Sequence, residues 1–375
     1  MAIALVVIVI FFQIQTGGGI LLPQNINNLI SQNAYVFVLA SGMLLCILTG
    51  GNIDLAVGSV VCFVGGIGAV MMQANINVWV AVVVMLVGGL LVGLWQGFWI
   101  AYVKVPPFIA TLAGMYAFRG LSNVVLQGYA VGINNTTFLN VFGGGADCYI
   151  PDFLHGNGMN ITCMIVGVIA VVIYIVMVFR SRIDAKSKGY EVQPIGIEIV
   201  KMVIISALVL WIFYKLANYK GLPTVLIWIA VVLLGYAYVT KNTRMGRYLY
   251  AVGGNEKATN LSGIDSRKVY MFAYVNMGLM AGLAGILTVA RATMAQPTFG
   301  NMYEMDAIGA CFIGGASAYG GEGNIFGVVI GALIMGVINQ GMSIMGVNAN
   351  YQTVVKGIVV LVAIIFDVLS NKKKK

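Results

Sequence analysis

The chain has 375 residues, of which 60% are hydrophobic and only 9% are charged. In a soluble globular protein about a quarter of the residues are charged, so this composition excludes an ordinary soluble globule. The net charge of +9 comes from basic residues in loops between apolar runs. That placement is typical of a positive-inside bias and does not indicate a nucleic-acid-binding groove. We therefore expect an integral membrane protein.

Twelve apolar runs approach the roughly 20 residues that a helix needs to cross the hydrocarbon. In chain order they are residues 1–15, 32–49, 55–73, 77–103, 107–127, 159–179, 195–216, 223–240, 269–290, 305–320, 325–345 and 351–369. Little sequence remains for a soluble domain. We predict one all-α domain over residues 1–375, a polytopic transmembrane helical bundle of about 10–12 spans. The run 305–320 is short enough to be a broken or re-entrant span.

The basic residues predict how the chain is oriented, because Lys and Arg are enriched in cytoplasmic loops. With the Lys372–Lys375 tail placed inside, fifteen basic residues fall in inside loops, against Lys220 and Arg291 outside. Both termini are then cytoplasmic, residues 128–158 form an external loop, and residues 241–268 form a cytoplasmic segment. The first run starts at Met1 without a basic flank and has a poor cleavage site, so we interpret it as a span. Its abrupt start leads us to expect a polar leader that is missing or unusually short.

The five cysteines show no metal-binding or disulfide spacing, and four of them lie in apolar runs. We interpret them as small core residues. The single histidine, His155, lies in a polar loop with Asp147 and Asp152, but the spacing does not match a metal site. We predict no metal ion and no cofactor in this chain.

Glycines at i, i+4 spacing recur within several runs. Gly89, Gly93 and Gly97 share one run, and Gly278 and Gly282 share another. A third run carries Gly327 and Gly331. Small residues at this spacing let helix backbones approach closely in a membrane, so they predict helix interfaces; chance spacing in a glycine-rich chain is the alternative.

The segment that begins at Arg244 carries the signals of a short capped helix. Gly253 and Gly254 predict a flexible turn, and Asn255 is a good N-cap. Glu256 would lie in the first helical turn, where the helix dipole favours an anion, and Gly263 would end the helix. A protruding helix of this kind suits contact with a separate ATPase, whereas a plain connecting loop is the alternative.

Five ionisable residues in or beside the apolar runs are candidates for a gate or a translocation path, because charges at membrane depth are costly and mark functional sites. They are Asp54, Arg119, Arg291, Glu304 and Asp306. Arg291, Glu304 and Asp306 lie within sixteen residues and suggest an outer gate or docking rim. An internal charge pair that fixes helix packing is an equally good interpretation.

Several blocks in one order resemble the permease subunits of bacterial ATP-binding-cassette monosaccharide importers. They include GNIDLAVGSV and KVPPFIATLAGMYAFRGL in the first half, and GRYLYAVGGNEKATNLSGI, AGLAGILTVARATMAQP and YEMDAIGACFIGGASAYGGEGNIFGVVIGALIMGVINQGMSIMGVNANYQTVVKG in the second half. Relative to ribose permeases, residues 180–240 contribute two extra spans, a feature similar to the longer xylose and multiple-monosaccharide branch.

The resemblance implies import of a pentose or hexose across the bacterial inner membrane. It implies a permease homodimer, an ATP-binding subunit with two nucleotide-binding domains that holds ATP and Mg²⁺, and an extracytoplasmic sugar-binding protein. Gly253, Gly254, Asn255, Glu256 and Gly263 would then contact the ATPase. In agreement, the sequence contains no G-x-x-x-x-G-K-[ST] phosphate-binding loop. We therefore expect a transport subunit and not an enzyme.

A second interpretation is an ATP-independent secondary carrier or facilitator for small polar solutes. Proton coupling would call for acidic residues in the middle of a span. Glu198, Asp306 and Asp367 all lie within four residues of the end of a predicted run, which counts against a carrier.

Overall fold

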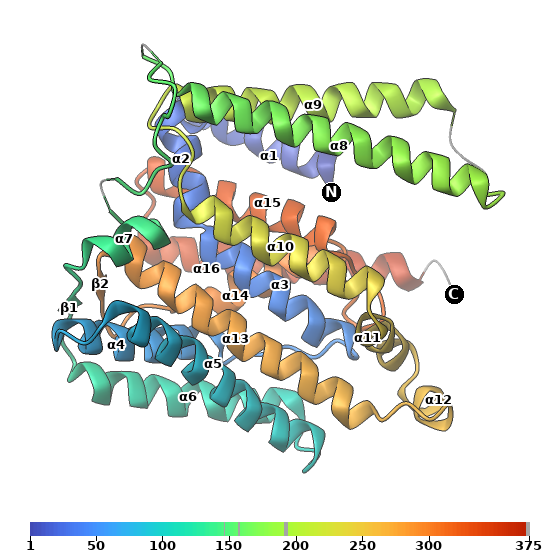
Figure 1. Cartoon of the computed structure of the whole chain (residues 1–375). Coiled ribbons are helices and arrows are strands. Elements are labelled where there is room, and N and C mark those ends of the chain that lie inside the picture. Colours follow the sequence, from blue (N-terminus) through green and yellow to red (C-terminus); the bar gives the residue numbers. More distant parts are fainter. Residues whose placement is uncertain (146, 157, 191–193, 373–375) are drawn as a thin grey trace. The chain divides into compact units, whose positions relative to one another are not determined.

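The computed structural model describes residues 1–145, 147–156, 158–190 and 194–372. The described chain is helical almost throughout, with one pair of two-residue strands, β1 (Val131–Gly132) and β2 (Met294–Ala295) (Figure 1). The helices are α1 (Ala2–Gln15), η1 (Gly19–Leu21), α2 (Pro23–Gln32), α3 (Ala34–Leu48), α4 (Val57–Gln73), α5 (Val78–Ala101), α6 (Pro107–Leu126), α7 (Thr136–Phe142), α8 (Ile161–Ser187), α9 (Ile195–Ala217), α10 (Val225–Asn242), α11 (Arg244–Gly254), α12 (Glu256–Leu261), α13 (Ser266–Ala292), α14 (Tyr303–Ile313), α15 (Ile325–Ile344) and α16 (Ala349–Lys372). The predicted all-α polytopic bundle is confirmed.

Each of the twelve predicted runs coincides with a helix, but the helices differ in length. Eight described helices are long and apolar enough to cross a membrane, or nine if α2 and α3 form one broken span. The apolar helices α1 and α4 have 14 and 17 residues, and α14 has 11. These three are shorter than the roughly 20 residues of a full crossing, which accounts for the difference from twelve.

The chain divides into two compact units. The main bundle comprises Met1–Ile20, Leu29–Cys148 and Val225–Lys375, and the second unit comprises Leu21–Asn28 and Tyr149–Thr224. The second unit contains the paired helices α8 and α9, so it includes much of the predicted extra segment 180–240. Within it, Asp152 accepts hydrogen bonds from Gly156 N, Ile161 N, Thr162 N and Thr162 Oγ1, which closes the loop before α8.

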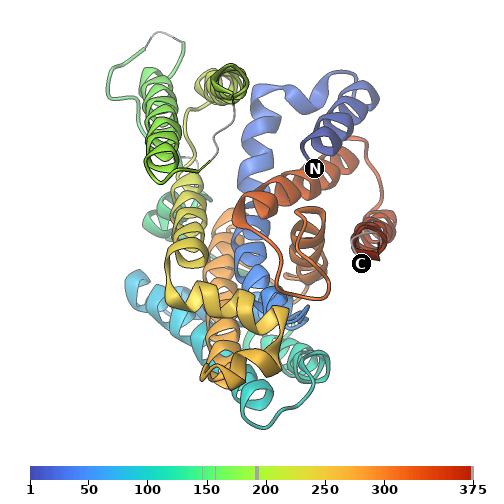
Figure 2. The ribbon, with the colours of Figure 1, turned by 90° about the vertical axis from the view of Figure 1, so that its right-hand side faces the viewer.

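The core of the main bundle is formed by α3 and α13. Every residue of α3 except Tyr35 is buried, as expected for a helix that is apolar on all sides. Helix α13 packs against α3, α4 and α5, and all three lie along it in Figure 1. By contrast, α16 contacts mainly α14 and lies at the edge of this unit in Figure 2. Its exposed apolar residues, such as Leu361 and Phe366, suit a lipid-facing surface.

The glycine spacing does mark helix interfaces. A Cβ added at Gly89 or Gly93 of α5 would collide with the backbone of α13 near Gly278, and the reverse holds for Gly278. Gly327 and Gly331 of α15 meet the backbone of α14 in the same way. The predicted glycine interfaces are therefore confirmed, and they explain how α5 and α13 come into backbone contact. The five cysteines are buried, as expected for core residues, and form no disulfide among the described residues.

Candidate functional site: the α11–α13 turn and the buried ionisable residues

Helix α11 begins at a side-chain cap and lies with one face on the core. Thr243 Oγ1 accepts a hydrogen bond from Gly246 N at 3.0 Å, and Leu249 and Val252 are buried. Gly253 and Gly254 are the last two residues of this helix. A Cβ at Gly253 would collide with the carbonyl of Leu48 and with the backbone of Gly321. Glycine is therefore needed here, because the backbone of α11 lies directly against these two backbone segments. The predicted flexible turn at Gly253 and Gly254 is wrong, because helix packing fixes this part of the backbone.

The predicted short capped helix is present as α12. Asn255 Oδ1 accepts a hydrogen bond from Ala258 N at 3.0 Å, as an N-cap does. Thr259 is buried and donates to Ala251 O at 2.9 Å, which ties α12 to α11. Gly263 has φ +83°, a left-handed conformation that glycine adopts without strain. On the exposed side, Leu261 is 90% exposed, which is unusual for a leucine.

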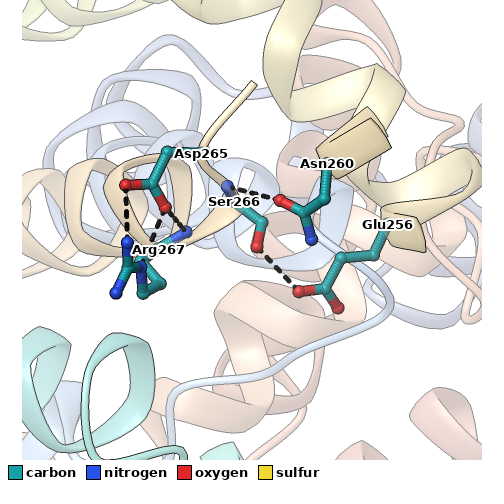
Figure 3. Close-up of polar contacts among 5 residues, drawn as sticks. All are labelled: Glu256, Asn260, Asp265, Ser266 and Arg267. Atoms are coloured by element: carbon teal, nitrogen blue, oxygen red, sulfur yellow. Dashed lines mark hydrogen bonds and ion pairs between the residues drawn. The ribbon is translucent and has the colours of Figure 1, made fainter. Parts of the chain in front are cut away.

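A polar network joins α12 to the start of α13 (Figure 3). Ser266 Oγ donates to Glu256 Oε1 at 2.8 Å, and Ser266 N donates to Asn260 Oδ1 at 3.1 Å. Asp265 is the N-cap of α13 and accepts from Arg267 N at 3.1 Å. The Arg267 side chain donates to the same carboxylate and holds the pKa of Asp265 below its usual value. The turn is thus held in one geometry relative to the long helix α13.

A cleft of about 720 Å³ opens beside this network, between the α5–α6 connection and the α12–α13 turn. Its polar and charged lining residues are Asn52, Lys104, Glu256, Asn260, Asp265, Ser266, Arg267 and Tyr270. Acidic and basic side chains occur together in it. This end of the main bundle therefore presents an exposed leucine next to a mixed-charge cleft, which suits a protein contact.

The ionisable residues predicted in or beside the spans have different direct partners. Asp306 is completely buried and is paired with Lys356 of α16, whose Nζ lies 2.8 Å from Oδ2. Tyr35 of α3 donates to the same oxygen at 2.6 Å, and Asn339 of α15 donates to Oδ1 at 3.5 Å. Asp306 therefore matches the alternative interpretation, an internal charge pair. The sequence reasoning missed Lys356, whose signal was a lysine in the interior of the run 351–369.

The other predicted path residues make contacts of their own. Arg119 Nη1 donates to the carbonyl oxygens of Phe299 at 2.6 Å and Pro297 at 3.2 Å. The Glu304 carboxylate lies beside Gly58. Asp54 is buried and accepts from Ala56 N at 2.8 Å. Arg291 lines a small cavity at the end of α13.

Comparison with known proteins assigns the chain to a family. Residues 25–364 match the family model described as "Branched-chain amino acid transport system / permease component". The chain belongs to this family of membrane permeases. It is a multi-pass membrane protein and a transport subunit, not an enzyme.

Individual relatives match this permease along almost its full length. The xylose transport system permease protein of Haemophilus influenzae is 36% identical over all of this chain and 96% of its own. The Escherichia coli protein of the same name is 34% identical, with 100% and 92% covered. The ribose import permease protein of Escherichia coli is also 34% identical, over 93% of this chain and 86% of its own. No solved structure matches the permease.

Proposed function

We propose that this permease is the membrane-spanning subunit of an ATP-driven importer that moves a pentose or hexose into the cytoplasm across the bacterial inner membrane. The observation that carries the proposal is the end-to-end match to the two xylose transport system permeases. The ribose permease match covers less of the chain, which favours a xylose-like substrate of the longer branch.

The partners follow from the same proposal. An ATP-binding subunit with two nucleotide-binding domains would hold ATP and Mg²⁺, and an extracytoplasmic protein would deliver the sugar to a permease homodimer. The sequence contains no phosphate-binding loop motif, which supports ATP hydrolysis by a separate subunit. With both termini in the cytoplasm, the α11–α13 turn faces the motor.

The rigid α12 turn supports its role as the contact to the ATPase. When the two nucleotide-binding domains of the ATPase close, they can move the permease only through a rigid contact element. Asn255 caps α12, and Glu256 and Asn260 bond to Ser266 at the start of α13. A displacement of α12 would therefore act directly on α13, the central helix of the main bundle.

The proposal is tested by purifying the tagged permease from native membranes in mild detergent and by reconstituting uptake in liposomes. We expect an ATPase with two nucleotide-binding domains to be recovered at about one per two permeases. Asn255→Ala with Glu256→Gln should lose this partner, whereas Asn255→Asp keeps the cap and should retain it. The exposed Asn301→Ala, outside the turn, serves as the matched control.

A secondary carrier is the second candidate, because the structure buries one acidic side chain, Asp306, completely inside the bundle. Asp306 and Lys356 form a buried acid–base pair inside the bundle. If the permease purified alone moved sugar without ATP in response to a pH gradient, the carrier would replace the importer. Uptake that depends on ATP and on the binding protein would exclude it.

A further inference from the structure

A small polar cavity of about 130 Å³ lies at the end of α13, between the start of α3 and the segment before α14. Since water occupies about 30 Å³ per molecule in the liquid, the cavity has room for several waters or part of one sugar ring. The lining residues that matter here are Ser31, Gln32, Tyr35, Arg291, Phe299 and Tyr303. Amide, hydroxyl, guanidinium and aromatic groups thus converge on one space.

Arg291 lacks a partner in the part of the chain that the structure describes. Its Nε is buried without a hydrogen bond, and none of the ion pairs there includes it. A guanidinium has five N–H donors, and a buried donor without an acceptor costs about 1–3 kcal/mol. A hydrogen-bond acceptor on a bound ligand would therefore stabilise this side chain.

The aromatic side of the cavity is held in place by the buried ion pair. The rings of Tyr35 and Tyr303 stack with centroids 3.6 Å apart and planes 13° apart. The Tyr35 hydroxyl donates to Asp306, which also pairs with Lys356. Asp306 and Lys356 thus act on the cavity through Tyr35 and are positioning residues.

The remaining wall is also fixed. Arg119 binds the carbonyl oxygen of Phe299, and Gly300 packs against the backbone of Gly58. Just before this segment, Ala295 of β2 pairs with Val131 of β1. A cavity whose walls are tied to three other elements is formed before any ligand arrives, as small-molecule sites usually are.

The cavity lies at the opposite end of α13 from the proposed ATPase contact. Ser266 and Arg291 are separated by 25 helical steps, which amounts to about 38 Å at 1.5 Å per residue. If α12 faces the cytoplasmic motor, Arg291 lies toward the outer surface, where the binding protein would release sugar.

We propose that this cavity is a monosaccharide subsite at the outer end of the translocation path. Arg291 donates hydrogen bonds to the hydroxyl oxygens of the sugar, and the tyrosine pair supplies an aromatic wall. Gln32 and Ser31 add polar groups that suit a neutral polyol. A site with so few polar contacts binds weakly and so permits release. The inference rests on the proposed function and adds the residues that handle the sugar.

The test uses the complete complex of permease, ATPase and binding protein in proteoliposomes, with D-xylose as the probe. Arg291→Gln should lower the maximal uptake rate about tenfold, the size expected for one charge-assisted hydrogen bond. The KM for D-xylose should stay unchanged, because the binding protein sets the apparent affinity. Arg180→Gln, the same replacement at an exposed arginine, should retain the wild-type rate.

Monodeoxy analogues of D-xylose separate sugar contact from a structural role. The wild-type complex should transport one of these analogues at a lower maximal rate than D-xylose. Arg291→Gln should transport that analogue and D-xylose at the same maximal rate. Arg291→Lys keeps the charge and is the second variant if Arg291→Gln fails to assemble; it should also lose the discrimination. Tyr35→Phe should lower the rate less than Arg291→Gln, since the ring remains.

Two results would overturn the subsite. One is ATP-driven xylose uptake by Arg291→Gln with wild-type rate and discrimination. The other is a wild-type complex that moves xylonate faster than D-xylose and loses only the xylonate activity in Arg291→Gln, which would make the cavity an anion site. A wild-type complex without any ATP-driven uptake would instead refute the proposed function.

Discussion

Lys356 on α16 and Asp306 on α14 form an ion pair with 2.8 Å between Nζ and Oδ2, and the carboxylate is completely buried. Tyr35 of α3 donates to the same carboxylate oxygen at 2.6 Å. The pair therefore links a peripheral helix, a short buried helix and the core helix. Because α16 contacts the bundle mainly through α14, this one lysine is a principal polar tether for α16.

Removal of Lys356 should destabilise the permease strongly. Lys356→Met leaves the buried Asp306 without its counter-charge, and breaking a buried pair in this way costs about 3–5 kcal/mol. The double variant Asp306→Asn with Lys356→Met carries no charge there and should recover most of the loss. Thermal unfolding of the detergent-solubilised permease, followed by size-exclusion chromatography, provides the measurement. Equal midpoints for the single and double variants would contradict a charge-pair role.

The α5–α13 interface should tolerate no added side-chain volume. Gly93→Val places a branched side chain against the backbone of Tyr274 and Val275, so we expect poor assembly and a lower yield in the membrane. Gly235→Ala is the matched control, because nothing lies within 4 Å of a Cβ at that position of α10. It should leave the yield unchanged or slightly higher, since alanine is the better helix former. A normal yield for Gly93→Val would argue against backbone contact between these helices.

Local sequence predicted the helices and their caps well, because these depend on neighbours along the chain. Asn255 and Gly263 bound α12 through bonds and backbone angles that involve only nearby residues. The i, i+4 glycines likewise indicated which face of each helix is an interface. They did not indicate the partner helix, since nothing in the spacing of Gly89 and Gly93 specifies Gly278.

The ionisable residues were harder to place, because their partners are distant in sequence. Asp306 lies 50 residues before Lys356 and 271 residues after Tyr35. Closeness in sequence grouped Asp306 with Arg291 and Glu304, but it did not indicate Lys356 or Tyr35, which bind the Asp306 carboxylate directly. Similarly, Glu198 pairs with Arg182 of α8 in the second unit, across two helices. Tertiary packing, and not composition, decides such pairs.

The loop before α8 should be sensitive to acid through Asp152. Its carboxylate accepts from Gly156 N at 2.8 Å and from Thr162, and these bonds hold the pKa of Asp152 below its usual value. A carboxylate with a lowered folded-state pKa stabilises the fold above its unfolded pKa of about 3.9. That contribution is lost as the pH falls from about 4 through the lower folded-state pKa.

Hydrogen exchange at the amides of Gly156 and Thr162 measures this effect. Protection should fall with pH below about 4 in the wild type, after correction for the intrinsic exchange rate. Asp152→Asn should already exchange faster at neutral pH and lose the acid dependence, while Asp147→Asn should behave as wild type. Unchanged protection in Asp152→Asn at neutral pH would show that the carboxylate does not close this loop.

Leu261 should be a principal contact of α12 with the ATPase. It is 90% exposed on α12, the helix whose Glu256 and Asn260 line the mixed-charge cleft, and an exposed leucine gains by burial in a partner groove. Leu261→Asp should reduce recovery of the ATPase about tenfold or more, because it removes roughly 1.5–3 kcal/mol of apolar burial. The permease itself should retain its thermal midpoint, since the side chain contacts little within the chain. Leu154→Asp, at an exposed leucine in the loop before α8, should bind the ATPase as the wild type does. Normal ATPase recovery with Leu261→Asp would mean that α12 does not insert its end into the motor subunit.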